Sequence, residues 1–292
     1  MPWIQIYTTV TEALAEPLSE ALIALGAASV TFEDAQDQPI FEPPLGTTPI
    51  WHNTRVRGLF AADTETAPLI AHLKQQLPEL VEHTFKVEQL EDKDWVRAWM
   101  DQFTPMQFGQ NLWIIPSWHQ PPNPKAINLM LDPGMAFGTG THPTTALCLT
   151  WLDQHPPHNK TVIDYGCGSG ILALAAHKLG AKSVIGVDID PQVIIASQQN
   201  AERNHAQIEF CLAQDLKTEP VDLLIANILA GPLQTLAAEF QRLLKPGGTL
   251  VLSGLLNSQA ETLQTHYAQL GIPLNTLKTQ EDWGLLAGQK QP

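Results

Sequence analysis

The sequence predicts an α/β protein with two domains, a small α+β domain followed by a larger doubly wound sheet. The chain has 292 residues, a length that suggests two domains. Strand and helix patterns in the first ninety or so residues follow the order β-α-β-β-α-β, and apolar strands alternate with amphipathic helices from residue 161 onward. We therefore expect a first domain at 1–92, a linker helix at 93–104 and a second domain at 105–292.

The first domain is expected to have the ferredoxin-like plan, because that fold has this order of elements. A leucine stripe, Leu14, Leu18, Leu22 and Leu25, predicts the first helix, and Gly26 ends it. The other elements are strands at 3–10, 29–32, 55–61 and 83–90 and a helix at 68–77. The two helices should cover one face of the sheet and leave the other face for a partner. No residue pattern in this domain indicates catalysis.

The linker carries an aromatic stripe. Trp95, Trp99 and Phe103 recur at i, i+4 and i+8, which predicts a helix over 95–103 with Asp94 as its N-cap. Packing between the domains is the interpretation we favour over stacking on a substrate.

The second domain is organised around residues 161–170. Val162 and Ile163 predict the end of a buried strand, Gly166, Gly168 and Gly170 predict a tight turn, and a helical pattern starts directly afterwards. A strand, a glycine turn and a helix together place bare backbone N–H groups beside a ligand. A purely structural turn between strand and helix is the alternative.

The next strand, 183–188, ends in Asp188, about twenty residues after the glycines, where a carboxylate can bind a ribose. The dinucleotide fingerprint G-x-G-x-x-G is not met, because Ile171 stands at its third glycine position. The pattern from Asp164 to Gly170 is D-x-G-x-G-x-G, which resembles the S-adenosylmethionine site of class I methyltransferases. Ile171 at the third glycine position therefore also argues against a nicotinamide-dependent oxidoreductase.

The remaining elements complete a doubly wound sheet, with ligands expected at the C-terminal ends of its strands. Asp190 and Pro191 predict the start of a helix. Asp215, after the strand at 208–212, either meets an adenine amine or is a solvated loop carboxylate. The other expected strands are 112–115, 127–132, 221–226, 249–252 and an antiparallel pair at 274–278 and 284–287, and the other helices are 141–151, 191–204, 233–244 and 258–270.

A second glycine-rich stretch precedes the helix at 141–151. Phe137 to Gly140 predicts a flexible loop that can close over a bound cofactor, with nearby hydroxyls donating to its carboxylate. A simple strand-to-helix turn is the alternative. His142 is either a general base or, beside Pro143 at the helix start, a structural residue.

Charge and cysteine content narrow the partners and the compartment. The net charge of −14 argues against a nucleic-acid backbone and favours a basic protein or peptide. Three cysteines cannot all pair and have no metal-ligand spacing, which indicates a reducing compartment and no metal site. The chain shows no signal peptide and no apolar run of membrane-spanning length, so we expect a cytoplasmic protein.

Three motifs together resemble the PrmA family, whose members methylate protein eleven of the large ribosomal subunit. They are Phe137–Thr145, Asp164–Gly170 and Asn227–Ala230, and the similarity also includes Gln89–Trp95. It implies an N-terminal domain that recognises the ribosomal protein and a catalytic domain that uses S-adenosylmethionine to methylate lysine side chains and the N-terminal amine. It also implies that residues matching Thr145, Gly166, Asp188 and Asn227 contact the cofactor. Gly168, in the glycine turn, completes the set of residues that we expect to bind the cofactor.

Methyl transfer to an amine requires a neutral amine aligned behind the methyl group. A lysine has a pKa of about 10.4, so neutralising it near pH 7 costs roughly 4 to 5 kcal/mol. Asn227 follows the central strand, and its amide oxygen is predicted to orient the amine, which makes it our one catalytic candidate. An Asn that only caps the strand end is the alternative. No side chain stands out as a general base.

Two other functions remain open from the sequence. Methyltransferases of amides or adenine amines usually have Asn-Pro-Pro-aromatic at this strand tip, whereas Asn227–Ala230 has no ring. That difference favours an aliphatic amine. A non-catalytic module that binds the cofactor during ribosome assembly is the third possibility.

Overall fold

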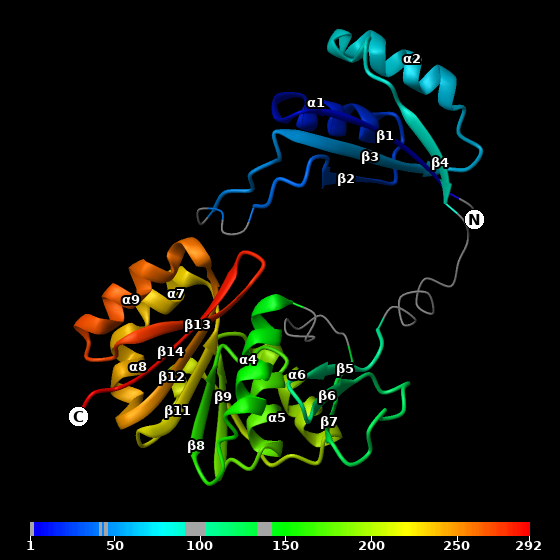
Figure 1. The fold of residues 1–292 in the computed structure, drawn as a ribbon. Coiled ribbons are helices and arrows are strands. Elements are labelled where there is room, and N and C mark those ends of the chain that lie inside the picture. The colour runs from blue at the N-terminus through cyan, green and yellow to red at the C-terminus, as the bar shows by residue number, and fades with distance from the viewer. Residues whose placement is uncertain (1–2, 41–42, 44–45, 91–102, 133–141) are drawn as a thin grey trace. The chain divides into compact units, whose positions relative to one another are not determined.

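The computed structural model describes residues 3–40, 43, 46–90, 103–132 and 142–292. The chain divides into two compact units, Met1–Met100 and Asp101–Pro292 (Figure 1). The expected linker helix and the motif Gln89–Trp95 fall largely within residues outside this description, as does the loop Phe137–Gly140.

The N-terminal unit is a four-stranded antiparallel sheet with two helices, in the sheet order β2-β3-β1-β4. This order confirms the ferredoxin-like fold that the sequence predicts. The last strand begins at Lys86, three residues later than expected. The elements are β1 (Trp3–Thr11), α1 (Glu12–Ala24), β2 (Ser29–Asp34), β3 (Asn53–Ala61), α2 (Thr66–Gln76) and β4 (Lys86–Leu90).

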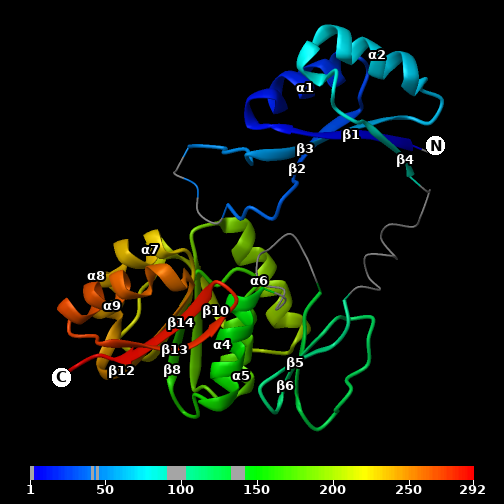
Figure 2. The same ribbon diagram turned by 45° about the horizontal axis from the view of Figure 1, so that its top comes forward.

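The core of this unit lies on one face of its sheet. In β1 the residues at even positions are buried, among them Ile4, Ile6 and Val10, because successive side chains of a strand point to opposite faces. They pack with Leu18 and Leu22 of α1. Both helices cover this face (Figure 2), so the opposite face of the sheet is left without a covering element among the described residues.

The second unit is built on a seven-stranded sheet in the order β10-β9-β8-β11-β12-β14-β13. Its strands are parallel except β14, which is antiparallel to both neighbours. This is the doubly wound sheet that the sequence predicts. The strands are β8 (Thr161–Tyr165), β9 (Ser183–Asp188), β10 (Glu209–Leu212), β11 (Val221–Asn227), β12 (Leu244–Leu256), β13 (Leu274–Gln280) and β14 (Trp283–Gln289).

Helices cover both faces of this sheet, so its central strands are apolar on both sides. Leu223 and Ile225 of β11 belong to one hydrophobic core, and Leu224 and Ala226 belong to the other. The helices are α4 (Pro143–Gln154), α5 (Ile171–Lys178), α6 (Pro191–Arg203), α7 (Ala230–Thr235), α8 (Ala237–Leu243) and α9 (Ala260–Gln269). A small sheet of β5 (Met106–Phe108), β6 (Leu112–Ile115) and β7 (Ile127–Met130) precedes them.

Two predicted elements of this unit differ in the structure. The single helix expected over 233–244 is two helices, α7 and α8, separated at Leu236, where ψ is 2°. Thr235 Oγ1 donates to the Gly231 carbonyl at 3.1 Å, a bond to position i−4 that often bends helices. Strand β12 begins at Leu244 rather than at Thr249, because Leu244 already pairs with Val221.

No helix in the described part of the chain is long and apolar enough to cross a membrane.

Candidate active site

The predicted site residues follow three adjacent strands. Strand β8 lies between β9 and β11, and all three are parallel. Their C-terminal ends therefore meet at one edge of the sheet. Gly166 follows β8, and Asp188 and Asn227 are the last residues of β9 and β11.

The glycine turn is attached to the neighbouring strand. The backbone N–H groups of Gly166 and Cys167 both donate to the Val187 carbonyl, at 2.7 and 2.9 Å. Gly166 has a φ of +78°, and a Cβ there would lie 2.2 Å from Cγ2 of Ile228. A side chain at this position would strain the backbone and force Ile228 to move.

The turn leads directly into a helix. Gly170, with a φ of +78°, is the N-cap of α5 and has no side chain with which to cap this helix end. The N–H groups in the first turn of α5, except that of Ala173, which donates to Asp164 Oδ2, are therefore donors at the edge of the sheet. Such an arrangement favours the negatively charged group of a ligand.

Asp188 holds the turn in place. Its Oδ2 accepts from the Gly168 N–H at 3.1 Å, and its Oδ1 accepts from Ile189 and Asp190 N–H groups at 2.8 and 3.2 Å. The side chain is half-buried. Because a carboxylate has about four acceptor positions, one oxygen still has room for a hydroxyl donor.

Asp164 lies beneath the turn and is almost fully buried, with 1% of its surface exposed. Its Oδ2 accepts from the Ala173 N–H at 2.9 Å, which attaches β8 to α5. Its Oδ1 has no hydrogen-bond partner in the described structure. The pKa of this carboxyl is raised to about 7, chiefly by burial and to a smaller extent by the nearby Asp188, while the Ala173 N–H opposes the shift.

Asn227 and Thr145, which are 82 positions apart, are brought together at the same edge. The Asn227 amide Nδ2 lies 3.3 Å from Thr145 Oγ1 and donates to it. Thr145, in the first turn of α4, is 2% exposed. This contact orients the Asn227 amide so that its Oδ1 is the group available to a ligand. The family resemblance implied that both residues contact the cofactor, but no residue pattern predicted the hydrogen bond between them.

The sequence left two roles open, those of His142 and Asp215, and the structure favours one interpretation only for His142. His142 is the N-cap of α4: its Nδ1 accepts from the Thr144 N–H at 3.3 Å. Its ring packs edge-on against Trp283 with centroids 4.9 Å apart, and burial lowers its pKa. These contacts favour the structural role. Asp215 is exposed at the end of a short 3-10 helix (Ala213–Asp215), and the structure leaves both of its interpretations open.

Comparisons with known proteins agree in one description. The family model for "Ribosomal protein L11 methyltransferase (PrmA)" matches residues 2–291. The chain is 64% identical to the ribosomal protein L11 methyltransferase of Hydrogenovibrio crunogenus, covering 100% of this chain and 99% of that protein. It is 55% identical to the protein of the same name from Aeromonas salmonicida, covering 99% of each.

A solved structure is similar as well. The crystal structure of the ribosomal protein L11 methylase from Lactobacillus delbrueckii subsp. bulgaricus superimposes with a TM-score of 0.60 at 32% sequence identity. The match covers 65% of this chain and 100% of that one.

Proposed function

Because the chain belongs to the ribosomal protein L11 methyltransferase (PrmA) family, we propose that it transfers methyl groups to the amines of ribosomal protein L11. It is an S-adenosylmethionine-dependent methyltransferase. The acceptors in this proposal are lysine side chains and the N-terminal amine. One observation carries it: a chain that matches the family model over residues 2–291 gathers Gly166, Asp188 and Asn227 at the edge of one sheet.

The residues of this edge fit S-adenosylmethionine. The backbone at Gly166 is bare, Asp188 has spare acceptor capacity for ribose hydroxyls, and Asp164 retains an unpaired buried oxygen. Gly168, whose N–H donates to Asp188, would place its bare backbone beside the same ligand, and Thr145 would supply a hydroxyl. We therefore propose Thr145, Gly166, Gly168, Asp188 and Asn227 as the residues that hold the cofactor.

When bound, S-adenosylmethionine supplies a methyl group that its sulfonium already activates. The protein must present a neutral amine in line with that methyl group. Asn227 is suited to this task, because its Nδ2 is occupied by Thr145 Oγ1 and its Oδ1 can accept a hydrogen bond from the amine. Alignment and desolvation of the amine act on the transition state and raise the rate of transfer.

Methylation of amides or adenine amines is less compatible with this strand tip. Asn227 is followed by Ile228 and Leu229, and 44% of the Leu229 surface is exposed. No ring stands there to stack on a flat substrate, whereas an aliphatic amine needs only apolar walls.

The division of labour follows the two units. We propose that residues 1–92 recognise the ribosomal protein, that 93–104 connect the units and that 105–292 carry out methyl transfer. A ribosomal protein as substrate also supports a cytoplasmic location for this chain.

Incubation of the full chain with labelled S-adenosylmethionine and L11, followed by mass mapping, tests the proposal. We expect label on lysine side chains and on the N-terminal amine, and none on asparagine or glutamine. A chain with Asp188→Ala serves as the control with weakened cofactor binding. Label confined to amides, or no label with wild-type protein and intact L11, would contradict the proposed function.

A further inference from the structure

The basic residues of the N-terminal unit are concentrated on the open face of its sheet. Residues 1–90 contain twelve Asp and Glu but only four basic residues, Arg55, Arg57, Lys74 and Lys86. The register places Tyr7 of β1 opposite both Arg57 and Lys86, and Thr9 opposite Arg55. Tyr7, Thr9, Arg55 and Arg57 alternate with the buried positions of β1 and β3, and Lys86 lies directly opposite Tyr7, so all five share the open face.

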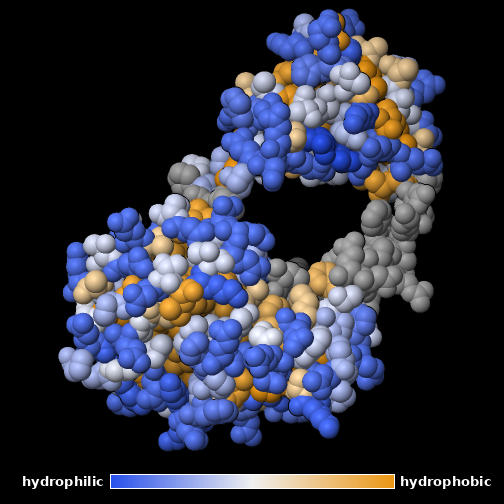
Figure 3. All heavy atoms as spheres, viewed as in Figure 1, coloured by the Kyte–Doolittle hydropathy of each residue, from blue (hydrophilic) through white to orange (hydrophobic). Residues whose placement is uncertain are grey.

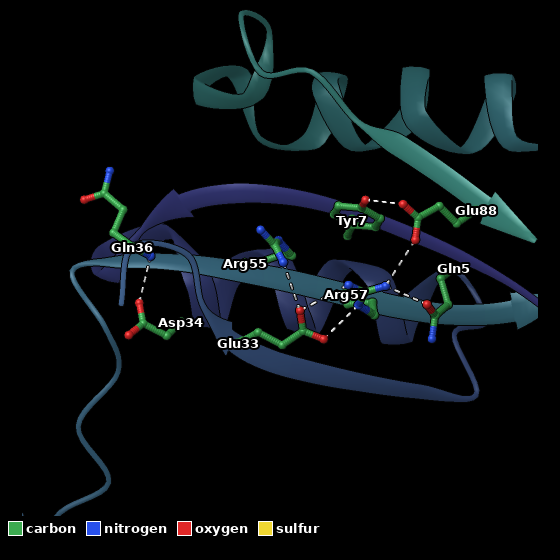
Figure 4. A network of polar contacts seen from close by, with 8 residues as sticks. All are labelled: Gln5, Tyr7, Glu33, Asp34, Gln36, Arg55, Arg57 and Glu88. Atoms are coloured by element: carbon green, nitrogen blue, oxygen red, sulfur yellow. Dashed lines mark hydrogen bonds and ion pairs between the residues drawn. The ribbon is translucent and has the colours of Figure 1, made fainter. Parts of the chain in front are cut away.

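Arg57 is committed to neighbours on this face. It donates to Glu33 from Nε at 2.9 Å and from Nη2 at 3.1 Å, and to Gln5 Oε1 from Nη1 at 2.6 Å (Figure 4). Its guanidinium carbon lies 4.4 Å from the centre of the Tyr7 ring. The Arg57 side chain, 17% exposed, is a fixed part of the sheet surface and has little capacity left for a ligand.

Arg55 and Lys86 differ from Arg57 in this respect. Arg55 reaches Glu33 with a single long contact of 3.4 Å, and 36% of its side chain is exposed. Lys86 is exposed and makes no ion pair within the described residues. Two cationic side chains therefore have donors to spare in a unit that is otherwise strongly acidic.

Both side chains line a hollow of about 370 Å³. His83 lines it too: its Nδ1 lies 2.9 Å from the Thr9 carbonyl, which therefore accepts from it and leaves the other ring nitrogen free. Glu82 is the one acidic residue of the lining, and the remaining lining residues are Tyr7, Thr8, Thr9 and Thr84. With His83 neutral, the lining carries a net charge of +1, which matches one carboxylate better than a chain of phosphates.

We propose that this hollow, between β1, β3 and β4, binds a carboxylate side chain of the protein substrate, with Arg55 and Lys86 as its counter-ions. The inference rests on the proposed function, because it takes L11 as the partner that brings the carboxylate. The planar guanidinium of Arg55 suits a carboxylate, with which it can form two parallel hydrogen bonds.

The charge of the whole chain favours a protein over a nucleic acid at this place. At a net charge of −14 the chain repels a phosphate backbone and attracts a basic protein. The face of the N-terminal unit seen in Figure 3 is mostly hydrophilic with some apolar groups, so polar contacts can set the register of a partner. A cationic hollow in an acidic surface accepts an acidic side chain of the partner at a defined position, which gives specificity.

The test compares full-length variants. Arg55→Gln combined with Lys86→Gln removes both charges, and Lys74→Gln is the matched control, because Lys74 lies outside the hollow and donates to the Val81 carbonyl. We expect the double variant to bind L11 about tenfold more weakly by calorimetry and to show a KM for L11 raised by about the same factor. Its kcat and its affinity for S-adenosylmethionine should stay unchanged, and Lys74→Gln should behave as wild type.

The single variant Lys86→Gln should fold normally, because it removes no ion pair of the described structure. We expect it to weaken L11 binding about threefold. A double variant that binds and methylates L11 as well as wild type does would overturn this proposal and leave the proposed function intact. Wild-type protein that neither binds nor methylates L11 would overturn both. Loss of binding to a ribosomal RNA fragment, with L11 binding unchanged, would reassign the hollow to phosphate and also overturn the proposal.

Discussion

The two units each pack helices on a sheet, yet they leave different parts of the sheet uncovered. In the N-terminal unit both helices lie on one face, and the other face presents Tyr7, Arg55, Arg57 and Lys86. In the second unit both faces are covered, and the free polar groups gather where the parallel strands end. A broad sheet face can bind the surface of another protein, whereas a row of strand ends can bind one small molecule.

The comparison assigns different work to the two units. Contacts on the open face involve charged side chains across three strands, so they can select a partner without touching the cofactor. Contacts at the strand ends involve backbone N–H groups and the side chains of Asp188 and Asn227, so they bind the cofactor and orient the acceptor.

Removal of the N-terminal unit should have the largest effect. A chain that starts near residue 105 keeps both hydrophobic cores of the second unit, so it should bind S-adenosylmethionine within a few-fold of the full chain. Its methylation of L11 should fall by a hundredfold or more, because the unit proposed to recognise L11 is missing. Calorimetry and a radiolabel assay measure the two quantities, and an unimpaired rate on intact L11 would refute the division of labour.

Asn227→Ala should affect turnover next most strongly. Loss of a positioned polar group in the transition state lowers kcat by roughly a hundredfold. The affinity for S-adenosylmethionine should stay within a few-fold of wild type, because backbone contacts survive the substitution. Asn275→Ala, an exposed residue of the edge strand β13, is the control and should leave both quantities unchanged.

Asp188→Ala should weaken cofactor binding by roughly ten- to a hundredfold, since charged hydrogen bonds are worth about 1.5 to 3 kcal/mol each. The variant also loses the acceptor for the Gly168 N–H. Asp190→Ala is the neighbouring control: it removes the N-cap of α6 and should cost about 1 kcal/mol of stability with unchanged cofactor affinity. Equal cofactor affinity in wild type and Asp188→Ala, measured by calorimetry, would take Asp188 out of the site.

The smallest effect concerns Asp164 and pH. Its pKa is raised to about 7 in the folded protein from an ordinary value of 3.8, so the folded state holds this proton more tightly. The stability from this group is present below about pH 4 and is lost as the pH rises through 7. Asp164→Asn should remove this part of the slope of Tm against pH, about 5 °C between pH 4.5 and 8. Asp215→Asn, at an exposed carboxylate, should keep the wild-type slope, and an unchanged slope in Asp164→Asn would contradict the buried carboxyl's raised pKa.

Interactions between residues close in the sequence were sufficient to predict much of the fold and part of the candidate site. The glycine turn, the strand that ends in Asp188 and the N-cap at Asp190 each depend on a few neighbouring residues, and the sequence predicts them. The Asp190 cap is confirmed by its carboxylate, which accepts from the Gln192 N–H at 2.8 Å. The open face of the ferredoxin-like sheet also follows from the order of elements alone.

Other features depend on contacts between distant segments and were not predictable. The Asn227 to Thr145 bond joins β11 to α4, and the arginine network of the N-terminal unit requires the register of β1, β3 and β4. The three-residue strand β5 is too short for a periodic pattern. The break between α7 and α8 depends on a side-chain bond from Thr235 that helix periodicity does not report.

The central claim is that the strand ends present a neutral amine to the methyl group, with Asn227 as the orienting residue. Single-turnover rates of the wild-type and Asn227→Ala proteins, measured with saturating S-adenosylmethionine and L11 over a pH series, test it most directly. We predict a roughly hundredfold lower rate for the variant near pH 7, and a smaller gap as the pH rises and more of the lysine is already neutral. Equal rates for the two proteins at every pH, or a variant that has lost the cofactor, would contradict the claim.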